Sequence, residues 1–234
     1  LILTNSQFTK EETEYFAQRG YFGKLPPIEA VPLGHQLRDT DEPITQPLPE
    51  EPYLLCVGTL TGRKNLETVL EAILDLSNRG RPVPQLILAG ARRKRTDDFV
   101  EQGRFKPIRD RIRFFRDPNQ TELRRLYEEA LALIIPSHME GWGLPLGEAL
   151  WLGTPGLAST APALREVGGD LAHYFDPTDP GALARLIDQL QSQPEERASL
   201  KARISRSQGE LRSWRDVAQN ILSATRKHLG GATS

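Results

Sequence analysis

The 234-residue sequence has one cysteine, one methionine and almost no excess charge of either sign. A single cysteine, Cys56, excludes a disulfide framework within this chain and a zinc site built from several cysteines. The 30 Lys and Arg residues stand against 31 Asp and Glu residues, which leaves a formal net charge of -1. We therefore expect no nucleic-acid partner, because such proteins usually bind through bulk positive charge.

Long apolar runs are also missing. No stretch of about 18 apolar residues occurs, so the sequence predicts no membrane-spanning helix. The first five residues, Leu1 to Asn5, lack an initiator methionine and the basic leader of a signal peptide. We interpret the chain as part of a longer protein whose upstream portion is missing, and we expect a cytoplasmic location, at or near the inner face of the membrane.

Short apolar runs and amphipathic segments are present along most of the chain. Up to residue 37, the pattern predicts strands at 1–4 and 28–32 and a helix at 9–19 that opens at Thr9. Residues 38–51 are rich in proline and acidic residues and are interpreted as a linker or an extended surface crossing, since proline continues neither a helix nor a central strand. The end of the chain predicts helices at 179–192, 194–207 and 213–228.

Between these segments, strands and helices alternate. The predicted strands are 53–57, 85–89, 111–115, 131–135 and 156–158, and the predicted helices are 65–78, 119–130 and 144–152. This alternation is typical of the α/β class, with a Rossmann-like, doubly wound parallel sheet. Because ligands bind at the carboxyl ends of such strands, the loops after Val57, Ala89, Phe115 and Ile135 are expected to carry the chemistry.

The densest motif follows the strand that ends at Ile135 and runs from Ser137 to Leu150. Gly141 and Gly143 allow a ligand to approach the backbone, and a helix that begins near Leu144 offers free amides to a phosphate. Glu140 and Glu148 are suited to accept hydrogen bonds from hydroxyls on either side of that phosphate. Two solvated carboxylates without a ligand are the alternative, and the spacing alone leaves both interpretations open.

A second motif, Gly58 to Asn65, also lies between a strand and a helix. Arg63 and Lys64 at the start of a helix oppose its dipole unless an anion neutralises them. They are therefore candidates for binding a diphosphate, with a solvated basic pair as the alternative.

Together these motifs resemble family 4 of the retaining nucleotide-sugar glycosyltransferases, which have the GT-B fold. Glu140 and Glu148 are similar to that family's pair of glutamates separated by seven residues. Gly58-Thr59 with Arg63-Lys64-Asn65 is similar to a Gly-Thr-x-x-x-Arg-Lys-Asn variant associated with mannosyl and similar transferases. Further similar blocks are Gly147 to Pro155, Leu164 to Asp170, Phe175 to Pro177, and Ser213-Trp214.

The resemblance implies how the chain is organised and what it does. Residues 1–37 would be the tail of the N-terminal acceptor domain, 52–212 the donor-binding domain, and 213–234 a helix that crosses back. The protein would move a hexose from a nucleotide diphosphate sugar to a saccharide or lipid-linked acceptor in polysaccharide biosynthesis. Mannose, and hence GDP-mannose, is the favoured donor. This chain alone is expected to be inactive, because the missing N-terminal part would hold most of the acceptor site.

The resemblance also implies roles for single residues. Glu148 would bind the ribose hydroxyls, and Glu140 the hydroxyls of the transferred sugar. Arg63 and Lys64 would neutralise the leaving diphosphate, so that neither a metal nor a cofactor is expected. The remaining predicted contacts with the sugar donor are Gly58, Thr59, His138, Gly141, and the backbone amides of Gly143, Leu144 and Leu146. Thr59 departs from the pattern, since many family members have arginine there.

Other interpretations stay open. The chain could be a catalytically inactive nucleotide-sugar-binding module. Gly141-x-Gly143-x-x-x-Gly147 with Glu166 is also similar to a loose dinucleotide fingerprint, which would indicate half of a nicotinamide-dependent oxidoreductase. A basic run from Arg92 to Arg116 predicts a solvated, mobile loop. The alternatives are that it steers an anionic donor or makes a peripheral contact with a membrane that carries a lipid-linked acceptor.

Overall fold

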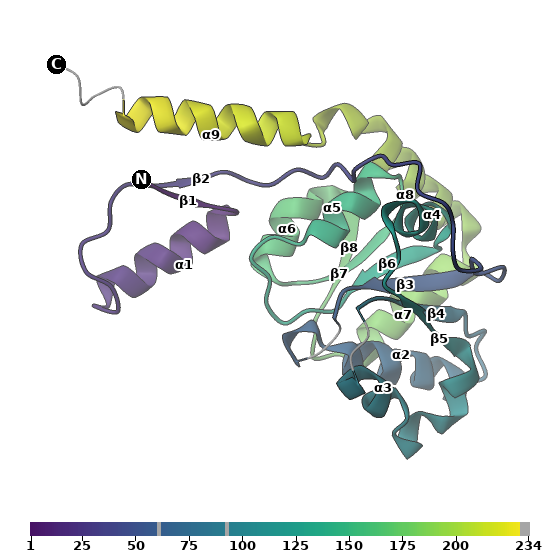
Figure 1. The fold of residues 1–234 in the computed structure, drawn as a ribbon. Coiled ribbons are helices and arrows are strands. Elements are labelled where there is room, and N and C mark those ends of the chain that lie inside the picture. Colours follow the sequence, from purple (N-terminus) through teal and green to yellow (C-terminus); the bar gives the residue numbers. More distant parts are fainter. Residues whose placement is uncertain (60–61, 92–93, 230–234) are drawn as a thin grey trace.

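A computed structural model describes residues 1–59, 62–91 and 94–229, apart from the side chains of residues 95 and 229. The chain forms a large α/β unit and a smaller N-terminal unit of residues 1–30, and the last helix, α9, lies beside the smaller one (Figure 1). Within the described ranges, none of the helices combines the length and the apolar character needed to cross a bilayer.

The large unit is built on a six-stranded sheet in the order β5-β4-β3-β6-β7-β8, with every neighbouring pair parallel. Its strands are β3 (Tyr53–Val57), β4 (Gln85–Gly90), β5 (Ile112–Arg116), β6 (Ala132–Ile135), β7 (Gly156–Ser159) and β8 (Ala172–Phe175). The strand order reverses between β3 and β6, so the loops after these two strands flank the crevice in which ligands of such sheets bind. The predicted doubly wound parallel sheet is confirmed.

Helices cover both faces of the sheet (Figure 1). One face packs against α4 (Gln120–Glu129), α5 (Leu144–Trp151), α6 (Pro162–Gly168) and α8 (Pro194–Arg206). The other packs against α2 (Leu66–Asn78), α3 (Lys94–Val100), the 3-10 segment η2 (Gly103–Arg111) and α7 (Pro180–Ser192). Successive strand residues alternate between the two cores, as Leu54 and Leu55 do, which explains why the strands are continuously apolar.

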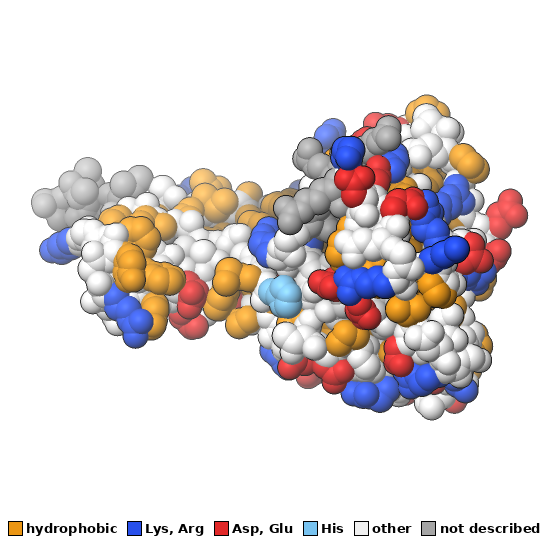
Figure 2. Space-filling view, turned by 90° about the horizontal axis from the view of Figure 1, so that it is seen from below, with side chains coloured by type: hydrophobic (Ala, Val, Ile, Leu, Met, Phe, Trp, Pro, Cys, Tyr) orange, Lys and Arg blue, Asp and Glu red, His pale blue; other side chains and the backbone are white. Residues whose placement is uncertain are grey.

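Most predicted elements are found within two residues of their expected ends, but the interpretation of the basic run as a mobile loop is wrong. Residues 94–100 and 103–111 form α3 and η2, and four arginines of η2 and β5 are paired with carboxylates. The pairs are Arg104 with Glu67 and Glu71, Arg109 with Glu101, Arg111 with Glu51, and Arg116 with Asp97. Arg92 and Arg93 lie outside the described residues. Acidic and basic side chains are interspersed on the face seen in Figure 2.

In the N-terminal unit, β1 (Ile2–Thr4) pairs in parallel with β2 (Ile28–Ala30), and α1 (Gln7–Gln18) connects them. The prediction that Thr9 opens this helix is wrong. Ser6 is the N-cap residue, because it has an extended backbone and its hydroxyl accepts a hydrogen bond from the Thr9 amide at 2.9 Å.

Residues 31–52 contain no helix or strand and cross the surface of the large unit, as expected for the proline-rich segment. Glu122 at the start of α4 anchors this crossing by accepting hydrogen bonds from the amides of Thr45 (2.7 Å) and Gln46 (3.0 Å). The chain returns along α9 (Trp214–Leu229), whose Lys227 and His228 lie 2.5 and 3.0 Å from the Glu29 carboxylate of β2. Residues 230–234 lie outside the described part of the chain.

Candidate functional site

Two cations from the loop after β3 meet one carboxylate from the loop after β6. Lys64 Nζ lies 2.6 Å from Oε1 of Glu140, and Arg63 Nη1 lies 2.8 Å from its Oε2. The Ser137 hydroxyl donates to the same Oε1 at 2.7 Å, and only 7% of Glu140 is exposed. The sequence positions of the cations and the carboxylate are 76 and 77 apart, and the sheet topology brings them together.

This cluster favours an ionised carboxylate and an additional anion. Burial raises the pKa of Glu140, but hydrogen bonds from Lys64, Ser137 and Arg63 outweigh it and hold that pKa below its ordinary value. Two cations sharing one carboxylate leave one positive charge in excess. The arrangement can therefore bind a phosphate without first breaking both ion pairs.

Asn65 was not among the predicted site residues, yet it holds the cluster in place. It adopts the left-handed conformation (φ 51°, ψ 46°), which asparagine tolerates better than most residues. Its side-chain amide donates to the carbonyls of Pro136 (3.0 Å) and Pro177 (2.8 Å), which follow β6 and β8. Three loops at the same edge of the sheet are thus joined directly beside Lys64. The asparagine after Arg63-Lys64 in the motif was the available signal.

The start of α5 lies in the same motif. Gly143 precedes the helix with φ 121°, and a Cβ there would lie 2.4 Å from Leu164 Cδ2, so glycine is required. Among the described residues, the amides of Gly143 and Leu144 have no hydrogen-bond acceptor. The Leu146 amide donates to the Gly143 carbonyl at 3.0 Å and the Leu146 side chain is buried, so its contact with a phosphate stays a prediction.

Glu148 lies one turn into α5 and is held apart from the ion-pair cluster. Its Oε2 accepts a hydrogen bond from the buried Tyr127 hydroxyl at 2.7 Å. Burial raises the pKa of Glu148, and the hydrogen bond from Tyr127 opposes that shift. The two glutamates of the motif therefore have different environments, one paired with cations and one with a neutral hydroxyl.

The remaining predicted residues lie at the same edge of the sheet. The Gly58 amide donates to Ala89 O at 2.9 Å, and a Cβ on Gly90 would lie 2.6 Å from Gly58 O, so the loops after β3 and β4 touch backbone to backbone. The Thr59 carbonyl accepts from the Thr96 hydroxyl at 3.2 Å. The amide of His138 donates to the Arg63 carbonyl at 2.9 Å, and its side chain is exposed.

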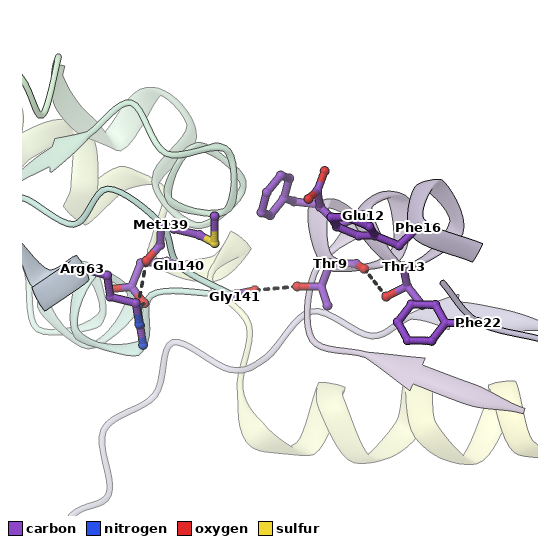
Figure 3. Close-up of a pocket in the computed structure, with 10 residues that line it drawn as sticks. Thr9, Glu12, Thr13, Phe16, Phe22, Arg63, Met139, Glu140 and Gly141 are labelled. Carbon is purple, nitrogen blue, oxygen red and sulfur yellow. Dashed lines mark hydrogen bonds and ion pairs between the residues drawn. The ribbon is translucent and has the colours of Figure 1, made fainter. Parts of the chain in front are cut away.

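A cavity of about 320 Å³ lies between this motif and α1 (Figure 3). One wall consists of Arg63, Met139, Glu140 and Gly141, and the other of Phe8, Thr9, Glu12, Thr13, Phe16 and Phe22. The Thr9 hydroxyl joins the walls by donating to the Gly141 carbonyl at 3.3 Å. None of the α1 residues was predicted, because their contribution depends on how the N-terminal unit docks.

The structure does not favour the dinucleotide interpretation. Glu166, which would bind the ribose of that cofactor, instead accepts hydrogen bonds from the backbone amides of Gln7 and Phe8. In the described part of the chain, no three His, Cys, Asp or Glu side chains lie close enough together to hold a metal ion.

Residues 38–206 match the family model of the glycosyl transferases group 1. The chain belongs to this family. It is 30% identical over 240 residues to the O-antigen chain mannosyltransferase B of Escherichia coli, an alignment that covers 96% of the chain and 60% of that relative. The chain thus spans less than two thirds of the length of this relative.

Solved structures show the same fold. Sucrose-phosphate synthase from Thermosynechococcus elongatus superposes with a TM-score of 0.76 at 24% identity, over 98% of this chain and 58% of that one. Anabaena HepE in complex with UDP superposes with a TM-score of 0.73 at 16% identity, over 97% of this chain and 64% of that one. The predicted α/β fold of a GT-B glycosyltransferase is confirmed.

Proposed function

We propose that this chain is the donor-binding part of a retaining glycosyltransferase, and that the whole protein moves a hexose from a nucleotide diphosphate sugar to a saccharide or lipid-linked acceptor. The name of the E. coli relative favours mannose, and we therefore propose GDP-mannose as the donor. The HepE complex with UDP supports a nucleoside diphosphate as the bound group.

The observation that carries the proposal is the shared contact of Lys64 and Arg63 with buried Glu140, at the point where the strand order reverses. In the bound state, the diphosphate lies at the start of α5, where it accepts hydrogen bonds from the Gly143 and Leu144 amides. Arg63 and Lys64 neutralise the charge that develops on the diphosphate as the glycosidic bond breaks. Such stabilisation of a leaving group can be the largest contribution to catalysis.

The two glutamates bind opposite ends of the sugar donor. Glu148 accepts hydrogen bonds from the ribose hydroxyls, with its carboxylate oriented by Tyr127. Glu140 accepts from hydroxyls of the transferred sugar, and its lowered pKa keeps it an acceptor at neutral pH. Arg63 is 57% exposed and Lys64 only 20%, so Arg63 is the cation that turns from Glu140 to the diphosphate.

We also propose that residues 1–37 and α9 belong to the acceptor side of the protein. The contact of Lys227 and His228 with Glu29 supports this assignment, because it joins the end of the chain to β2. As a fragment, the chain is then expected to bind the sugar donor without efficient turnover.

Calorimetric titration of GDP, UDP and NADH into this chain tests the proposal. We expect GDP or UDP to bind, and we expect Glu148→Gln and Lys64→Met each to weaken that binding about tenfold or more. Glu195→Gln, an exposed carboxylate on α8, is the matched control and should bind as the wild type does. Binding of NADH alone would contradict the proposal.

Turnover separates the transferase from an inactive binding module. The full-length protein should release GDP from GDP-mannose in the presence of saccharide acceptors, and it should discriminate against other nucleotide sugars. Nucleotide binding without transfer to any acceptor would favour the inactive module.

A further inference from the structure

A carboxylate from a distant part of the chain caps the N-terminus of α1. Oε2 of Glu166 accepts from the Gln7 amide at 2.8 Å, and its Oε1 accepts from the Phe8 amide at 2.7 Å. The Ser6 hydroxyl accepts from the Thr9 amide at 2.9 Å, and the Ser6 carbonyl accepts from the Lys10 amide. All four amides of the first turn therefore have partners, and α6 supplies two of them.

This contact depends on a side chain that has two acceptor oxygens and a negative charge. Each carboxylate oxygen serves one amide, and the negative charge lies at the positive end of the dipole of α1. A side chain with a single acceptor oxygen cannot reproduce it. The contact also joins α1 of the N-terminal unit to α6 of the large unit, so it fixes the position of one unit against the other.

The same end of α1 lies against the motif that contains Glu140. Besides the bond from Thr9 to the Gly141 carbonyl, a Cβ added at Gly141 would lie 3.2 Å from Asn5 Nδ2. The cavity beside Glu140 has one wall on α1 and the other on the motif, as Figure 3 shows. This cavity exists only while the start of α1 is held in this position.

We propose that Glu166 is a positioning residue, which docks α1 on α6 and thereby builds the cavity wall beside Glu140. The effect of Glu166 on turnover rests on the proposed glycosyl transfer. Its docking of α1 on α6 is independent of that proposed function. Removal of the carboxylate should leave nucleotide binding by the large unit intact and lower the rate of the step that needs both walls of the cavity.

Amide hydrogen exchange on the full chain tests the docking. In Glu166→Ala, the amides of Gln7 and Phe8 should exchange about tenfold faster than in the wild type. Glu166→Asp, which keeps two acceptor oxygens, should restore part of the protection, whereas Glu166→Gln should restore less because its amide group faces a backbone N–H. Glu195→Gln is the matched control. Unchanged protection in Glu166→Ala would overturn the proposal.

Kinetics of the full-length protein test the consequence. We expect kcat/KM of Glu166→Ala to fall about tenfold, while the Kd for GDP or UDP stays within about twofold of the wild type. An equal loss of nucleotide affinity, or no loss of turnover with faster exchange, would overturn the positioning role. If the wild type itself transfers no sugar, the proposed function fails, and hydrogen exchange still decides whether Glu166 docks α1.

Discussion

The Lys64 ammonium lies 2.6 Å from the Glu140 carboxylate, and the two side chains are only 20% and 7% exposed. Arg63 contacts the same carboxylate with 57% of its side chain exposed. The two ion pairs therefore differ in how much solvent screens them, although they share one acceptor. Lys64 contributes mainly by satisfying a buried charge, while Arg63 keeps its freedom to meet a ligand.

Substitution of these two cations should separate their contributions to stability. We expect Lys64→Met to lower the free energy of unfolding by about 2 kcal/mol, because it leaves a buried carboxylate with one partner fewer. Arg63→Met should cost less than about 1 kcal/mol, as is usual for exposed pairs. Urea denaturation at pH 7 measures both values, and equal losses would contradict this account.

The stability difference between wild type and Lys64→Met should depend on pH, which tests the contribution of the Lys64–Glu140 ion pair independently. Because the folded-state pKa of Glu140 is lowered, its ion pairs stabilise the fold fully above the ordinary value of 4.5. That contribution is lost as the pH falls through the lowered folded-state pKa. The gap in stability between wild type and Lys64→Met should therefore narrow below pH 4.5.

The hydroxyl of Tyr127 should matter for nucleotide binding, and that of Tyr53 should not. Tyr127→Phe removes the hydrogen bond that orients Glu148, so we expect nucleoside diphosphate affinity to fall about fivefold in calorimetry. Tyr53→Phe is the matched control, because its buried hydroxyl donates to the Leu126 carbonyl at 2.9 Å and not to Glu148. Each variant should lose about 1 kcal/mol of stability. Equal affinities in both variants would be evidence against the role of Glu148.

Gly143 should not tolerate a side chain. In Gly143→Ala, the new methyl group would lie 2.4 Å from Leu164 Cδ2 on a backbone with φ 121°, so we expect a loss of about 2 kcal/mol or more and weaker nucleotide binding. Gly103→Ala serves as the control, because no heavy atom lies within 4 Å of the position that its methyl group would take and its φ is not positive. Thermal unfolding that shows the same midpoint for both variants would contradict the prediction.

His35 should make the stability of the protein sensitive to acid. The residue is 6% exposed, and its Nδ1 accepts from the Arg212 amide at 3.1 Å while its Nε2 lies 3.3 Å from the Val167 carbonyl. Burial lowers the pKa of His35 below 6.5, so the unfolded state binds the proton more readily. The contribution of neutral His35 to the free energy of unfolding is complete above pH 6.5 and is lost as the pH falls through its folded-state pKa.

We expect the free energy of unfolding to decrease less on acidification from pH 7 to 5 in His35→Gln than in the wild type. Burial also lowers the pKa of His173, so His173→Gln should separately reduce the dependence of the free energy of unfolding on pH. Chemical denaturation across this pH range measures the slopes, and an unchanged slope in His35→Gln would exclude the histidine as a cause.

The sequence predicted the sheet and the loops that carry the site, because each strand is a short apolar run and each motif follows one directly. It did not predict α3 and η2, because both segments are short and mostly polar and therefore show little apolar periodicity. The short elements α6 and β8 also escaped prediction, since seven and four residues give little periodicity.

The sequence singled out most residues of the candidate site, but it did not predict the contacts between them. Arg63, Lys64 and Glu140 were each singled out from local motifs, yet their shared ion pairs depend on the order of β3 and β6 in the sheet. The same limit applies to Glu166, whose partners lie 158 and 159 positions away. The hydrogen bond from the Leu146 amide to the Gly143 carbonyl could not be predicted either, because it depends on the local geometry at the start of α5.

A crystal structure of this chain with GDP or UDP tests the central claim most directly. We expect the diphosphate to contact Arg63, Lys64 and the amides of Gly143 and Leu144, with the ribose hydroxyls on Glu148. A nucleotide bound elsewhere, with Arg63 and Lys64 both still paired only with Glu140, would contradict that claim.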